Sequence, residues 1–217
     1  MPTKPRGPRI VKGALASIET GAPSPRFIYF QYNPATLKRS LKPLLVGGEA
    51  GDRSQAVRIT GAPSETISVE IEIDATDDLE TGAANAQSLG IQPQLAALEL
   101  LVFPPSSRVI SNTRLLSLGT IEIAPITAPR LLFVWGQHRV LPVRLSTYTV
   151  SEEEFDATLN PIRATVSLEM QVLSYSDLSS GNRDYQQYLA YQQWLESIAR
   201  TAVTSRSAAL GAAAIVR

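Results

Sequence analysis

The stretch over residues 66–74 constrains the fold of this 217-residue chain more than any other. Its side chains alternate between apolar and polar at every position. One side carries Ile67, Val69, Ile71 and Ile73, and the other carries Thr66, Ser68, Glu70, Glu72 and Asp74. A two-residue period is typical of a β-strand with one face on a core and the other on water or a partner. The pattern therefore predicts a sheet that is packed on one face only.

Further strands are predicted on both sides of this one. Residues 27–32 contain five apolar or aromatic side chains in six and are predicted to be a strand covered on both faces. Residues 131–135 form an apolar run, and a turn at 136–138 leads from it into residues 139–150. In that strand, Val143, Leu145, Thr147 and Thr149 are predicted to share a face. Residues 163–173 alternate again, and Ala164, Val166, Leu168, Met170 and Val172 form their apolar side. Strands joined by short turns are typical of an antiparallel meander, so we predict a mainly β fold, a barrel or sandwich with one short helix.

The short helix is predicted from about Pro93 to Val102, after a loop over residues 75–90. Proline fits the first turn of a helix, and Leu95, Leu98 and Val102 form one apolar stripe. Pro104-Pro105 is predicted to end the helix, because the residue before a proline is disfavoured in helical geometry.

A second helix is predicted from Asp184 to about Val203, following a linker at 179–182. Its seam consists of Tyr188, Tyr191, Leu195, Ile198 and Ala202. An isolated helix of this length is marginal in water, so the seam must dock, either on its own sheet or on a neighbouring subunit. We predict that this helix and the N-terminal arm reach neighbouring components, so truncation after Ser180 should spare folding and impair assembly.

The chain is thus divided into three parts. Residues 1–20 are predicted to be a basic, extended N-terminal arm, since residues 1–12 hold Lys4, Arg6, Arg9 and Lys12, three prolines and no acid. Residues 21–175 form the β-barrel domain, and residues 176–217 form a linker, a helix and an Ala-rich tail.

Composition argues against several classes of function. The chain has no Cys and one His, so thiolate metal sites, cysteine nucleophiles and three-His metal sites are excluded within one chain. Its 20 basic and 20 acidic residues balance, whereas nucleic-acid binders usually carry a basic surplus. No apolar run is long enough for a membrane span, and no secretory signal is recognised, so a cytoplasmic protein is expected.

No residue is predicted to be catalytic, to bind a cofactor or to bind a metal. His138 lies in a predicted turn that aims it at solvent, and no nucleophile elbow accompanies it. The acids at 152–156 lack the spacing of a calcium loop. The candidate sites are instead assembly surfaces: Glu70 and Glu72 on the acidic strand, and Tyr188, Tyr191 and Trp194 on the C-terminal helix.

Several motifs in a fixed order carry a family resemblance. They are Phe30-Gln31-Tyr32-Asn33-Pro34, the acidic strand at 65–74, Val102-Phe103-Pro104-Pro105, Phe133-Val134-Trp135-Gly136, and the block from Glu154 to Ala164 with Asn160-Pro161-Ile162-Arg163. Together they resemble the tube-type baseplate adaptors, the LysM-adaptor family of contractile injection systems and phage-tail-like particles. The C-terminal LysM module that many members carry is not recognised in residues 176–217.

The resemblance implies structural work without enzymatic activity. It implies a tail-tube-like antiparallel β-barrel, six copies of which form a ring inside a particle assembled in the cytoplasm. Its partners would be further copies, the inner tube protein, the spike hub protein, and baseplate or sheath components, with no nucleic acid. Two alternatives stay open: a tube-initiator ring of the same particle, and a monomeric ligand-binding or hydrolytic β-barrel.

Overall fold

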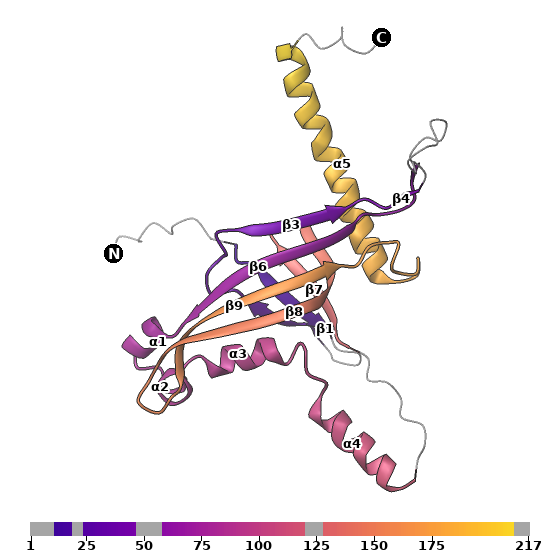
Figure 1. Ribbon diagram of the computed structural model, residues 1–217. Helices are drawn as coiled ribbons and strands as arrows, with labels where there is room; N and C mark the ends of the chain where they lie inside the picture. Colours follow the sequence, from indigo (N-terminus) through magenta and orange to yellow (C-terminus); the bar gives the residue numbers. More distant parts are fainter. Residues whose placement is uncertain (1–10, 19–23, 47–57, 120–127, 211–217) are drawn as a thin grey trace, which may run out of the picture.

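The computed structural model describes residues 11–18, 24–46, 58–119 and 128–210, with side chains described as far as residue 202 (Figure 1). Within these ranges, an antiparallel sheet of seven strands has the order β2-β1-β7-β8-β9-β6-β3, and a hairpin of β4 and β5 continues the β3–β6 pair. The strands are β1 (Ala14–Ile18), β2 (Arg26–Tyr29), β3 (Leu37–Lys42), β4 (Leu45–Val46), β5 (Arg58–Ile59), β6 (Ser64–Asp74), β7 (Arg130–Trp135), β8 (Arg139–Phe155) and β9 (Pro161–Val172). The predicted mainly β, antiparallel fold is confirmed.

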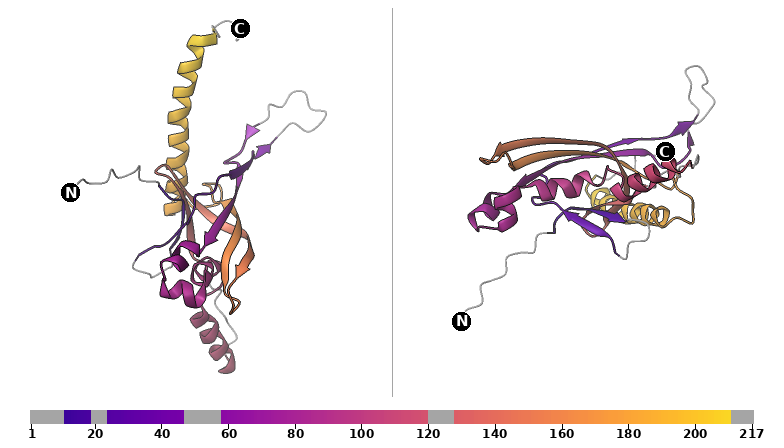
Figure 2. Two further views of the ribbon diagram at one scale, coloured as in Figure 1. Left: turned by 90° about the vertical axis from the view of Figure 1, so that its left-hand side faces the viewer. Right: turned by 90° about the horizontal axis from the view of Figure 1, so that it is seen from below.

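The sheet curls around the core (Figures 1 and 2). Strands β3, β6, β9 and β8 form a front layer in Figure 1, and β7, β1 and β2 lie behind it. The long β8 belongs to both layers, because its residues 139–143 pair with β7 and its residues 143–155 pair with β9. The core fills the space between the layers.

The alternation predicted for β6 and β9 is confirmed by their register. Ile67 lies opposite Met170, and Ile71 lies opposite Val166, and all four side chains are buried. Glu70 lies opposite Ser167 on the other face. Each strand therefore gives one face to the core and the other to the surface, as a two-residue period requires.

The face assigned to β8 is wrong beyond Leu145. A β-bulge lies between Leu145 and Thr147, so that Leu145 pairs with Met170 but Thr147 pairs with Glu169 on the opposite face. The extra residue reverses the alternation, and Tyr148 packs against the core in place of Thr147.

The helices differ from the prediction in number. The loop predicted over 75–90 contains α1 (Thr76–Glu80) and α2 (Ala84–Leu89). The next helix, α3 (Gln92–Glu99), buries Leu95 and Leu98 as predicted, whereas Val102 is exposed. A further helix, α4 (Ser106–Ser117), was not predicted. Pro104-Pro105 separates α3 from α4, because proline disfavours helix before itself and is well suited to the start of the next one.

The prediction of an extended arm over residues 1–20 is wrong for residues 14–18. Residues 14–18 form β1, an inner strand whose Ala14, Leu15 and Ala16 are buried, while residues 1–10 lie outside the described ranges. The next strand, β2, is an edge strand, and the prediction that both its faces are covered is wrong. Phe27 and Tyr29 stack on each other at the surface, and Phe30 beyond the strand is buried.

The C-terminal helix α5 runs over Arg183–Leu210, longer than predicted. Its first turns pack on the sheet, and its C-terminal half projects away from it (Figure 1). The helix therefore contributes to the core near its start and extends from the domain at its end.

Candidate assembly surfaces

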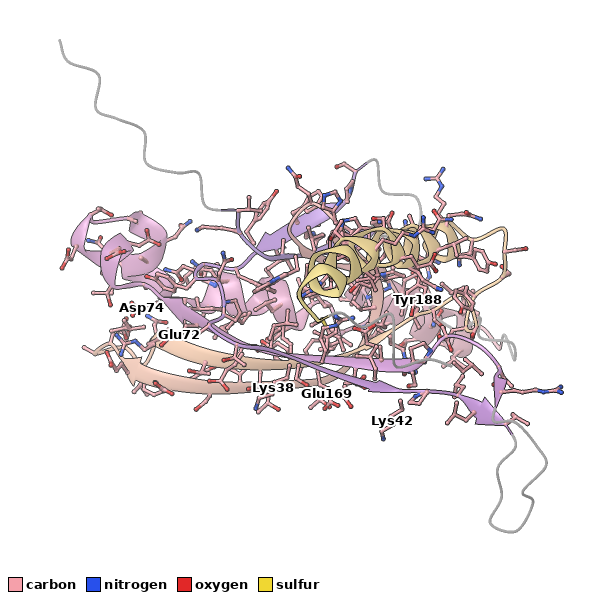
Figure 3. All side chains as sticks on the ribbon, turned by 90° about the horizontal axis from the view of Figure 1, so that it is seen from above. Lys38, Lys42, Glu72, Asp74, Glu169 and Tyr188 are labelled. Atoms are coloured by element: carbon pink, nitrogen blue, oxygen red, sulfur yellow. The ribbon has the colours of Figure 1, made fainter. Side chains whose placement is uncertain are left out.

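The outward side of the front layer is a continuous polar surface, which we call the polar face. It consists of the side chains on β3, β6, β9 and residues 144–155 of β8 that point away from the core. Figure 3 shows Lys38, Lys42 and Glu169 on this side of the sheet, opposite α5 and Tyr188. A hollow of about 710 Å³ lies over its centre. Its outward-pointing strand residues are Lys38, Ser68, Glu70, Glu72, Thr147, Thr149, Thr165, Ser167 and Glu169.

Short hydroxyl side chains and charges of both signs dominate the strand positions around the hollow, and Phe155 is exposed at the far end of β8. Arg144 Nη2 donates a hydrogen bond to Gln171 Oε1 at 2.6 Å, and Thr147 Oγ1 lies 3.5 Å from Glu169 Oε2. Such a surface is compatible with contact with water or with a polar partner, and it offers little apolar area for adhesion.

The front layer has two free edges among the described residues. One is the outer edge of β3, which pairs only with β6. The other is β8 beyond Val143, where β9 is its one described strand partner. Unpaired strand edges are templates for pairing with another chain, so both are candidate contact sites.

A hydrogen-bonded network holds one end of the front layer in place. Arg163 donates to Asp74 Oδ2 at 2.9 Å and to Glu154 Oε1 at 2.9 Å. Gln31 accepts a hydrogen bond from the Asp74 amide at 2.9 Å and donates one to its carbonyl at 2.6 Å. Hydrogen bonds from Thr76, together with Arg163, lower the pKa of Asp74. The network ties the segment after β2 to β6 and β9.

The β8–β9 turn beside this network is also well ordered by side-chain hydrogen bonds. Asp156 Oδ1 accepts from the amides of Thr158 at 2.7 Å and Asn160 at 2.8 Å. Hydrogen bonds from the side chain and the amide of Asn160, together with those from Thr158, lower the pKa of Asp156 to about 2. Leu159 takes a left-handed conformation, with φ of 66° and an exposed side chain.

On the core side, α5 is anchored by aromatic and charged side chains. Tyr188 and Tyr191 are 5% and 3% exposed. Arg39 donates a hydrogen bond to Glu65 at 2.6 Å and lies 6.0 Å from the centre of the Tyr191 ring. Burial opposes the charge of Arg39, but the hydrogen bond and charge of Glu65 raise its pKa. A second ion pair joins Arg130 of β7 to Asp184 in the first turn of α5.

The predicted assembly residues fall into two groups. Glu70 and Glu72 are exposed on the polar face, on an inner strand, and their role as an interface stays a prediction. Tyr188 and Tyr191 are both buried within this chain, so this part of the seam docks on its own sheet and not on a neighbouring subunit. Trp194 is half-buried and stacks on His138, with ring centres 5.1 Å apart.

Sequence reasoning missed the free edge of β8, Glu65 and the exposed apolar helix α4. Glu65 begins the acidic strand at 65–74, yet it has the same parity as Ile67 and points into the core. That parity is the signal that could have identified it. Nothing in the sequence near residue 146 marks the bulge that separates the two halves of β8.

The described residues contain no group of three or more His, Asp or Glu side chains placed to hold a metal ion. Among the same residues, no helix combines the length and apolar character needed to cross a membrane.

No protein-family model matches the chain, and no curated protein matches it in sequence. Among solved structures, it is similar to the tail of an empty GTA particle, computed with helical refinement and C6 symmetry. The two are 9% identical, with a TM-score of 0.32, and the likeness covers 74% of this chain and 90% of that one. At this TM-score and identity, the likeness establishes neither a family nor a function for this chain.

Proposed function

We propose that this chain is a structural, non-enzymatic component of a contractile, phage-tail-like injection particle. Copies form a ring that joins the inner tube to the spike hub and baseplate, and the polar face lines its channel. One observation carries the proposal: a sheet layer packed on one face and polar on the other, with free edges on β3 and β8.

The strand directions favour ring closure through these edges. Each strand of the front layer is antiparallel to its neighbour, and the order is β8-β9-β6-β3. Strands β8 and β3 therefore run in opposite directions. If the ring axis runs parallel to the strands, rotation about it keeps the direction of every strand. In that case β3 of one copy meets β8 of the next copy as an antiparallel pair. The front layers of all copies would then join into one large antiparallel barrel.

Charges on the two edges support the same pairing. On the polar face, Lys38 and Lys42 stand on β3 and Glu153 stands on the free part of β8, where Arg144 is hydrogen-bonded to Gln171 within the chain. Glu152 is exposed on the other side of β8, in register with Ala164. Opposite charges across a strand pair are stabilising, and like charges are destabilising. The two edges are therefore better partners for each other than for themselves.

In such a ring, Glu70 and Glu72 would face the channel or a protein that enters it. The hydroxyl-rich hollow around them suits a water-filled passage. Charge reversal of both residues is expected to impair assembly more than folding, because both side chains are exposed. An unchanged level of assembly would contradict their role.

The number of copies and the identity of the neighbours come from the resemblance to tube-type baseplate adaptors. It suggests six copies, with inner tube, spike hub, and baseplate or sheath proteins as partners, in a particle assembled in the cytoplasm. A tube-initiator ring is the alternative within the same particle. Labelling the chain in intact particles and locating the label below or above the first tube layer separates the two.

The ring is tested by electron microscopy of the native complex, combined with crosslinking across the proposed seam. The chain has no Cys, so Ser40→Cys on β3 and Thr149→Cys on β8 introduce unique thiols on the polar face. With a short bismaleimide, the double variant should give a ladder of covalent oligomers, and each single variant should give dimers at most. A monomer by microscopy, with no ladder, would contradict the ring.

The monomeric hydrolytic barrel makes a different prediction about His138. The imidazole is exposed and stacked on Trp194, so we expect His138→Ala to leave assembly unchanged. Loss of a measurable hydrolytic activity in this variant, with normal assembly, would favour the enzyme.

A further inference from the structure

One end of the molecule is strongly acidic. We call it the acidic end; it comprises residues 74–90, with α1 and α2, and residues 151–160, with the β8–β9 turn. These two segments contain eight acidic residues and no Lys or Arg. Asp77, Asp78 and Glu80 are exposed and make no ion pair with any described residue. The acidic end therefore carries excess negative charge at the surface.

An apolar patch lies within the acidic end. Leu89 is 43% exposed, Phe155 49% and Leu159 77%. The two segments that carry them are in contact, because Asn160 Nδ2 donates a hydrogen bond to the Ser88 carbonyl at 3.2 Å. Large apolar side chains on one ordered surface are typical of an interaction site.

The conformation of Leu159 is a second, independent sign of such a site. Its left-handed φ of 66° is unfavourable for a leucine and is readily adopted by glycine or asparagine. The Leu159 side chain does not pack in the core, because it is 77% exposed. A leucine held in a strained turn with its side chain in solvent contributes little to this chain alone, and such strain is common at binding surfaces.

Helix α4 has the complementary properties. Residues 100–119 contain Arg108 and Arg114 and no acid. Val109, Ile110 and Leu116 are 46%, 68% and 52% exposed and lie within about 120° of one another around the helix, while Leu115 and Leu118 are exposed on the other side. No residue of α4 is buried, so its apolar side is not covered by any described part of the chain.

The two surfaces lie on opposite sides of the molecule. In Figure 1, α1 and α2 lie at the lower left and α4 projects at the lower right, and the view from below in Figure 2 separates them in the same way. Complementary patches on opposite sides of one subunit generate head-to-tail contacts between copies.

We infer that α4 of one copy docks on the acidic end of a second copy of this chain. Its apolar side covers Leu89, Phe155 and Leu159, and its arginines face the carboxylates of α1. This inference rests on the proposed ring, because only an assembly of copies brings the two surfaces together. It adds a contact between copies that is separate from the β3–β8 seam.

Charge exchange tests the contact in the full-length chain. One variant reverses the helix (Arg108→Glu with Arg114→Glu), and the other reverses the acidic end (Asp77→Lys with Asp78→Lys). Each variant alone should self-associate at least about tenfold more weakly than the wild type in sedimentation velocity, because attractions between exposed charges across the contact become repulsions. An equimolar mixture of the two should regain association, because each helix then meets an end of opposite charge. Failure of the mixture to recover, or wild-type association of either variant alone, would overturn the inference.

Crosslinking locates the contact without reliance on affinity. Ile110→Cys and Leu159→Cys, introduced in separate chains of different mass, should give a mixed dimer with a short bismaleimide. The matched control is Asn112→Cys, which lies about 200° around the helix from Ile110 and should give several-fold less product with Leu159→Cys. Equal yields for both pairs would overturn the inference. So would a link within one chain that carries both Ile110→Cys and Leu159→Cys.

The outcomes separate this contact from the ring itself. Rings in the microscope without the Ile110–Leu159 product would reject the α4 contact and leave the ring. The product without rings, at any protein concentration, would reject the ring and retain a head-to-tail contact.

Discussion

Removal of the C-terminal helix should unfold this domain. Truncation after Ser180 deletes Tyr188 and Tyr191, which are 5% and 3% exposed in the core, and the partner of Arg130. A buried tyrosine removes about 150–250 Å² from water, or about 4–6 kcal/mol at ~25 cal/mol per Å² as an upper limit. The two together are worth up to about 8–12 kcal/mol, against a total stability of about 5–15 kcal/mol for a typical domain. This reverses the expectation from sequence that such a truncation spares folding.

The assay is urea denaturation followed by far-ultraviolet circular dichroism and tryptophan fluorescence. A chain that ends at Ser180 should show no cooperative transition, or a midpoint close to zero denaturant. The matched control ends at Ser197, retains the buried tyrosines and Trp194, and should lose about 1 kcal/mol or less, because Ile198 is already 41% exposed. An unchanged midpoint for the Ser180 truncation would refute the reasoning that α5 belongs to the core.

Three further predictions concern single positions. Gly90→Ala should destabilise the fold by about 3 kcal/mol, since φ is +57° and a Cβ would lie 2.1 Å from the Pro161 carbonyl oxygen. Gly136→Ala, at φ of +81° with no atom near the Cβ, should cost only about 1–2 kcal/mol, and equal losses in thermal denaturation would contradict the clash. Tyr148→Phe should raise the free energy of unfolding by about 1 kcal/mol, because the buried hydroxyl has no hydrogen-bond partner among the described residues; a loss in urea titration would indicate a bound water instead. The pKa of Asp156, about 2 in the fold against 3.8 without it, predicts a stabilisation that is complete above pH 4 and lost as the pH falls toward 2. A carboxyl ¹³C titration midpoint near 3.8 would contradict it.

The face that a side chain occupies could be predicted from the sequence where the environment of the strand is the same along its length. The inward faces of β6 and β9 follow from alternation, because the core lies on one side along their whole length. The second half of β8 could not, because the bulge between Leu145 and Thr147 depends on its pairing with β9. The aromatic residues of β2 indicate burial by composition, yet Phe27 and Tyr29 lie at an edge where the sheet ends.

The candidate surfaces were predicted less completely than the fold. The exposure of Glu70 and Glu72 follows from the two-residue period alone. Whether the tyrosine seam of α5 docks on its own sheet or on a neighbour depends on tertiary packing against strands that are distant in sequence, and no local pattern encodes that packing. Helix α4 was missed because Pro104-Pro105 was interpreted only as the end of α3 and not also as the start of a new helix.

The charges on the free edges explain how this chain could assemble in one way without aggregating in others. An exposed strand edge is a hazard, and charged side chains on it are a common protection. Here the protection differs between the two edges, because Lys38 and Lys42 stand on the polar face of β3 whereas Glu153 stands on the polar face of β8. Two β3 edges would place like charges together, as would two β8 edges, so two-fold dimers are disfavoured through either edge. The unlike pair is favourable, and an interface between unlike surfaces of identical chains forms a ring where the rotation between neighbours closes and a filament where it does not. Lys38→Glu with Lys42→Glu should therefore block the pairing that the proposed ring requires, and the further exchange Glu153→Lys should restore part of it. Rings of normal abundance in the variant that carries only Lys38→Glu and Lys42→Glu would show that backbone pairing, without charge, selects the partner.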